Sequence, residues 1–126
     1  MKRTLAAVLA LILVFAFSSA AFADSGSLSN QEVRGGASQI IAWGTRSEPN
    51  TMDLRVTSIT WNGQSNFLFR GYDWETGLDC TYAKRVTGTG YFQATYTSNA
   101  TEIDMYASIS STSTSDYLVF SGAYYL

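Results

Sequence analysis

The sequence predicts an all-β protein, a small antiparallel β-sandwich of about seven strands that follows a cleaved signal peptide. β-Branched and aromatic residues dominate the chain after residue 36, and turn-forming residues recur about every 8–12 residues, as they do in sandwiches and barrels. No apolar spacing of about 3.6 residues, which would indicate helices, persists in that region. A partly open β-barrel fits the same pattern and is the alternative architecture.

Residues 1–23 have the layout of a secretory signal peptide. Lys2 and Arg3 precede an apolar run over residues 5–17, and an A-x-A cleavage site at residues 21–23 stands directly before Asp24. The alternative is a membrane anchor, because this uncharged stretch is just long enough to span a bilayer. Two serines, Ser18 and Ser19, and the cleavage site argue against the anchor and favour export with cleavage. We therefore expect a secreted, bacterial-type protein that is extracellular, or periplasmic in a cell with an outer membrane.

Cleavage would leave 103 of the 126 residues, enough for one domain. Residues 24–36 are polar and end in two glycines, and we expect a flexible N-terminal segment there, followed by a single β domain over residues 37–126. The mature chain has 6 basic and 10 acidic residues, a net charge of −4. Because these charges are interspersed, the sequence indicates no nucleic-acid partner. No second apolar segment could form a transmembrane span, and we expect a monomer.

The single cysteine, Cys80, excludes an intramolecular disulfide and is expected to be a small buried side chain. The absence of histidine excludes serine–histidine and cysteine–histidine catalysis and histidine metal sites. One cysteine cannot hold zinc by itself. We therefore expect no cofactor.

Three turns predict β-hairpins. Asn62-Gly63 is typical of a type I′ turn and would place Val56 opposite Phe69. The loops at residues 88–90 and 99–100 would join three strands, about 78–86, 91–97 and 101–109, into a meander. In each register one face is apolar throughout, as a strand packed on a core requires. In the meander this buried face would include Tyr82, Ala94 and Met105. A first strand near residues 40–45 and a last near 117–125 complete the set.

Carboxylates are the remaining candidates for chemistry. Glu102 and Asp104 share one face of a strand, and a small glycoside hydrolase needs two such acids on either side of its substrate. A solvated strand face explains the same pair. Asp73, Glu75 and Asp79 crowd one turn and form a weak calcium candidate, although the turn lacks the spacing of a calcium-binding loop. We expect no resident metal.

The outward face of the predicted meander is the candidate ligand site. It would gather aromatic rings for stacking against sugar faces and polar side chains for the sugar hydroxyls: Tyr91, Tyr106, Gln93, Asp104 and Arg85. Tyrosine is also an ordinary strand residue. The tryptophans Trp43, Trp61 and Trp74 are the second choice of stacking residues.

The sequence therefore predicts a secreted, non-catalytic binding domain whose ligand is a carbohydrate or another cell-surface group. One alternative is a secreted antibacterial or antagonist protein of the bacteriocin or toxin type. The other is the small carboxylate-based glycoside hydrolase.

The mature protein is expected to begin at Asp24, because the A-x-A triplet ends at Ala23. The intact mass of protein recovered from culture supernatant measures this directly. A mass that includes residues 1–23 would instead support the membrane-anchor alternative.

Overall fold

The computed structural model describes residues 24–126, so the predicted signal peptide lies outside the described residues. This part of the chain contains no helix, and hence no helix that could cross a membrane. It forms eight strands: β1 (Ser25–Arg34), β2 (Gln39–Thr45), β3 (Thr51–Asn62), β4 (Phe67–Asp73), β5 (Lys84–Val86), β6 (Gly90–Thr95), β7 (Glu102–Ser108) and β8 (Tyr117–Tyr125). The predicted all-β class is confirmed, with one strand more than expected.

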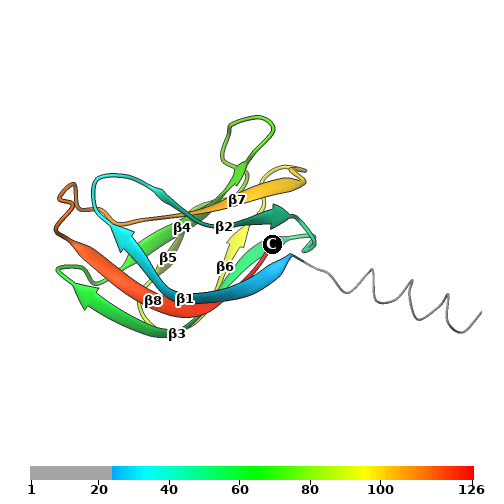
Figure 1. Cartoon of the computed structure of the whole chain (residues 1–126). Helices are drawn as coiled ribbons and strands as arrows, with labels where there is room; N and C mark the ends of the chain where they lie inside the picture. The colour runs from blue at the N-terminus through cyan, green and yellow to red at the C-terminus, as the bar shows by residue number, and fades with distance from the viewer. Residues whose placement is uncertain (1–23) are drawn as a thin grey trace, which may run out of the picture.

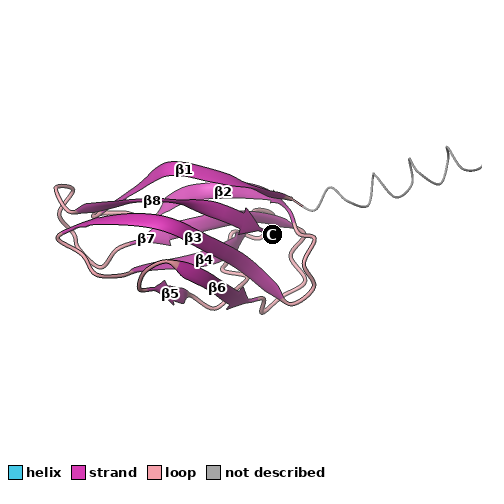
Figure 2. Cartoon of the chain, turned by 90° about the horizontal axis from the view of Figure 1, so that it is seen from below, coloured by secondary structure: helices cyan, strands magenta, loops and turns pink. Residues whose placement is uncertain are grey.

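The strands form two antiparallel sheets of four strands each, arranged as a sandwich (Figures 1 and 2). Sheet A has the order β1-β8-β3-β6, and sheet B has the order β2-β7-β4-β5. In Figure 1, β1, β3 and β8 lie in the lower layer, and β2, β4 and β7 lie in the upper layer. The predicted strands near residues 40–45 and 117–125 are β2 and β8.

The core lies between the two sheets and is built from alternate residues of each strand. Met52, Leu54 and Val56 of β3 are buried, as are Phe67 and Phe69 of β4. The ring of Phe67 stacks on Phe120 of β8 with 5.0 Å between centroids, a contact that joins sheet B to sheet A. The apolar faces predicted for these strands are therefore confirmed.

The strand pairings predicted from the turns are wrong. β3 pairs with β6 and β8, whereas β4 pairs with β5 and β7, so the turn at Asn62-Gly63 leads from one sheet to the other. Val56 lies opposite Gly90 and Gly122 rather than Phe69. Gly63 nevertheless has a φ of 76°, the left-handed conformation that glycine favours.

The predicted meander is also divided, because β6 belongs to sheet A while β5 and β7 belong to sheet B. Ala94 and Met105 are both buried as expected, but they reach the core from opposite sheets. Tyr82, which the predicted register buried, is 71% exposed. The segment before β5 makes isolated bridges instead of a continuous strand, which leaves this ring outside the core.

Residues 24–36 are not a flexible segment, because most of them form β1, an edge strand paired with β8. Leu28 and Val33 of β1 are buried in the core. These two residues are five positions apart, and in a regular strand an odd spacing would put them on opposite faces. A β-bulge between Leu28 and Gln31, where Asn30 has a φ of 48°, shifts the register so that both face the core. The bulge hides the alternation that would have predicted a strand.

We expect Gly122→Ala to destabilise the fold by about 3 kcal/mol, because the added methyl group fits only if backbone is displaced. Gly122 lies in the central strand β8, where a Cβ atom would overlap the backbone carbonyl of Arg55 in β3. The measurement is the denaturant midpoint. Gly88→Ala is the matched control, because a Cβ at Gly88 would have no neighbour within 4 Å. Equal midpoints for the two variants would contradict the close approach of β8 to β3.

Candidate functional site

The outer face of sheet B gathers aromatic and charged side chains. In the register of this sheet, Asp104 of β7 lies between Trp43 of β2 and Tyr72 of β4. Tyr106, two residues further along β7, lies beside Arg70 of β4. Strand alternation sets this arrangement: the β7 residues between these positions are buried, so their neighbours point outward.

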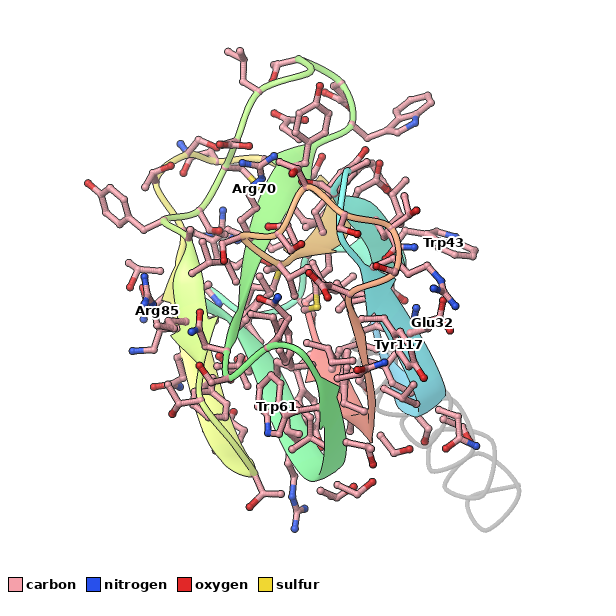
Figure 3. The ribbon with its side chains drawn as sticks, turned by 90° about the vertical axis from the view of Figure 1, so that its left-hand side faces the viewer. Glu32, Trp43, Trp61, Arg70, Arg85 and Tyr117 are labelled. Atoms are coloured by element: carbon pink, nitrogen blue, oxygen red, sulfur yellow. The ribbon has the colours of Figure 1, made fainter. Side chains whose placement is uncertain are left out.

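Two exposed tryptophans border a shallow groove on this face. Trp43 is 72% exposed and Trp74 is 70% exposed, and Figure 3 shows Trp43 projecting away from the sandwich. The groove has a volume of about 290 Å³ and is lined by Trp43, Gly44, Trp74, Glu102, Ile103 and Asp104. We call it the tryptophan groove. β7 forms its floor, since β7 lies between β2 and β4.

Backbone contacts hold Trp74 beside the groove, although this residue follows the end of β4. Its amide donates a hydrogen bond of 3.1 Å to the carbonyl of Glu102. The preceding Asp73 is buried, and its Oδ1 accepts a 2.9 Å hydrogen bond from the amide of Glu75. Asp73 therefore fixes the turn that presents the indole ring.

Neighbouring side chains extend the surface along β7. Tyr72 and Tyr106 meet edge to face with 5.4 Å between ring centroids. Arg70 forms an ion pair with Asp79, 3.5 Å from Nε to Oδ1. Glu102 accepts a 3.2 Å hydrogen bond from the Thr45 hydroxyl. Aromatic faces and polar groups thus continue beyond the tryptophans.

The five residues predicted as a ligand site do not lie on one face. Asp104, Tyr106 and Arg85 belong to sheet B, whereas Tyr91 and Gln93 belong to β6 of sheet A. Within sheet B, Arg85 lies on β5, at the opposite edge from β2. Figure 3 accordingly shows Arg85 and Trp43 projecting from opposite sides of the molecule. The structure keeps Asp104 and Tyr106 together and separates them from the other three.

Tyr91 supports a buried acid on sheet A. Its hydroxyl donates a hydrogen bond to Oδ2 of Asp53, which is 5% exposed. The other oxygen, Oδ1, is buried without a hydrogen-bond partner in the described part of the protein. The hydrogen bond to Asp53 raises the pKa of Tyr91 to about 12. The bond therefore stabilises the fold at neutral pH, and its contribution is lost as the pH rises through about 12.

The weak calcium candidate is not assembled. Asp73 is used in its own turn and Asp79 pairs with Arg70. Within residues 24–126 no group of three or more potential ligand side chains is placed to hold a metal ion. Cys80 is a buried free thiol, as expected, and its burial raises its pKa to about 11.

Glu102 and Asp104 both point from β7 into the tryptophan groove. They lie two residues apart on one strand, so they sit side by side rather than on opposing walls. The two catalytic carboxylates of a glycoside hydrolase act from opposite sides of the glycosidic bond, so they must lie on opposing walls. The third tryptophan, Trp61, is partly buried against the core and takes no part in the groove.

The groove itself was not predicted, although both of its tryptophans were second-choice stacking residues. Trp74 stands in a turn of acidic residues, and Trp43 stands beside a glycine near the end of its strand. The acidic neighbours of Trp74 are the sequence feature that could have indicated an exposed ring, whereas Trp43 follows an apolar run and carries no such signal.

The chain matches no family model, and neither a curated protein nor a solved structure is significantly similar to it. The functional conclusion therefore depends on the geometry of the groove.

We expect Tyr91→Phe to destabilise the fold by about 1–3 kcal/mol, because it leaves the buried Asp53 carboxylate without its hydrogen-bond donor. Chemical denaturation measures the change. Tyr82→Phe is the matched control, since this ring is 71% exposed and should leave stability unchanged. If the two variants were equally stable, Tyr91 would have no structural role and would return as a candidate ligand residue.

Proposed function

We propose that this protein is exported and that its β domain is a non-catalytic module that binds glycans in the tryptophan groove. The observation that carries the proposal is the pair of tryptophans, both at least 70% exposed, on either side of the Glu102 and Asp104 carboxylates. Rings of this size are ordinarily buried, and their exposure together indicates a binding surface.

The chemistry of a sugar suits the two kinds of group in the groove. The C–H face of a pyranose ring packs on an indole ring, and its hydroxyls donate hydrogen bonds to carboxylates. Trp43 and Trp74 supply the rings, while Glu102 and Asp104 supply the acceptors. The groove therefore offers both the apolar and the polar contacts that one sugar unit needs.

The shape of the surface favours a chain of sugars over a single small molecule. The groove is shallow, and the contact of Tyr72 with Tyr106 continues the aromatic surface along β7. A surface of this kind buries little area for each sugar, so we expect a Kd of about 0.1–1 mM.

Binding without hydrolysis is the better-supported activity. The two acids of the groove come from one strand, and no described side chain of the groove faces them as an acid from the other side. Export is supported by the order of basic, apolar and small residues at the N-terminus.

We expect Trp43→Ala and Trp74→Ala each to weaken glycan binding about tenfold, since each removes one stacking face. A glycan array identifies the ligand, and titration calorimetry then measures the affinity of each variant. Tyr82→Ala is the matched control, because it removes an equally exposed ring that does not line the groove.

The proposal fails if no glycan on the array is bound, or if both tryptophan variants bind as tightly as the parent. Growth inhibition of neighbouring bacteria by the purified protein would then favour the antagonist alternative. Release of reducing sugar, abolished by Glu102→Gln, would favour the hydrolase.

A further inference from the structure

We infer that the glycans preferred by the tryptophan groove carry protonated amines, so that chains of 2-amino-2-deoxyhexose units bind more tightly than their N-acetylated counterparts. This inference rests on the proposed function and names its ligand class. It follows from the charge inside the groove and from the character of the two rings beside it.

The groove contains two carboxylates and no basic side chain. Glu102 accepts a hydrogen bond from the neutral Thr45 hydroxyl. Neither Glu102 nor Asp104 forms an ion pair within residues 24–126, where the ion pairs are Arg34 with Glu32 and Arg70 with Asp79. No side chain of residues 24–126 therefore neutralises the two negative charges of the groove. In a chain cleaved before Asp24, the new α-ammonium lies on a residue that contacts Gly44 and Thr45, and the side-chain carboxylate of Asp24 offsets its charge.

The basic side chains near the groove contact groups outside it, or lie far from it. Arg70 shares the outer face of sheet B, but Asp79 neutralises it. Arg46, which follows β2, donates to the carbonyls of Ser98 and Glu48, and its guanidinium lies 3.8 Å from the centroid of the Tyr96 ring. These two guanidinium groups thus already have partners.

Arg85 is the remaining base on this face. It pairs in register with Leu68, which lies opposite Ser108, so it is two strands across from β7 and four residues along from Asp104. Strand geometry makes that separation roughly 16 Å, about twice the screening length of about 8 Å at physiological ionic strength. Arg85 therefore contributes little to the field in the groove.

The tryptophans favour the same sign of charge as the carboxylates do. A cation within about 6 Å of an indole face is attracted by the ring quadrupole, and tryptophan is the strongest partner among the aromatic residues. Trp43 and Trp74 flank the two acids, so an ammonium group in the groove gains from both kinds of contact. An N-acetylated sugar keeps the stacking but loses the charge, and a uronic acid is repelled.

The test compares two oligomers of the same length, β-1,4-linked glucosamine and its fully N-acetylated form, by titration calorimetry at about pH 6 and low salt. The sugar amine is largely protonated at this pH. We expect the amine oligomer to bind about tenfold more tightly. About 1 M NaCl should remove most of this preference, because the screening length falls to about 3 Å.

The double variant Glu102→Gln, Asp104→Asn keeps the size of both side chains and removes both charges. We expect it to bind both oligomers more weakly, because neutral amides are poorer acceptors for sugar hydroxyls than carboxylates are. The preference for the amine oligomer should fall from about tenfold to about two- to threefold, the part that the indole rings contribute. Glu32→Gln is the matched control, since it removes a charge from sheet A and should leave the preference unchanged. Circular dichroism verifies folding, and Asp104→Asn alone replaces the double variant if that variant unfolds.

Equal binding of the two oligomers by the parent protein would overturn this inference and leave the proposed function standing. A preference for the amine that is undiminished in the double variant, or in Asp104→Asn alone if the double variant unfolds, would also overturn it, because the carboxylates would then not be its source. Binding of neither oligomer, nor of any glycan on the array, would overturn the proposed function itself.

Discussion

The structure depends on the contact between the inward faces of its two sheets. The chain has one cysteine, so no internal disulfide holds the sandwich together and packing must do so. The stacked rings of Phe67 and Phe120 show this contact directly, because they come from different sheets. The same packing sets the outer surface. Burial of Ile103 and Met105 in β7 requires Glu102 and Asp104 to point to solvent, so the floor of the groove follows from the core beneath it.

The sequence predicted which residues are buried better than it predicted which strands are neighbours. The inward faces of β3 and β4 were correct, but the hairpin drawn between them was not. Apolar alternation records only that a side chain faces the core. The alternation of a strand is the same whether the next strand is its neighbour in the same sheet, about 4.8 Å away, or lies in the facing sheet, about 10 Å away across the core. Turn residues such as Asn62-Gly63 supply a positive φ without deciding between these two cases.

The candidate site shows the same limit. The outward positions of Asp104 and Tyr106 could be predicted from the alternation of β7. The separation of Tyr91 from them could not, because it depends on β6 joining sheet A. Trp74 lies beyond its strand, where alternation says nothing, and it reaches the groove through a backbone hydrogen bond to Glu102. Sequence patterns carry no information on such a contact between a turn and a strand distant in the chain.

Shape and charge in the groove come from different parts of the fold. The rings belong to β2 and to the turn after β4, while the carboxylates belong to β7 between them. All four of these side chains lie outside the core cluster, whereas Ile103 beneath them belongs to it. Substitutions at the rings or the acids therefore leave the contact between the sheets intact. In the proposed binding mode, substitutions at the rings or at the acids can thus change the affinity for a glycan without changing the stability of the fold.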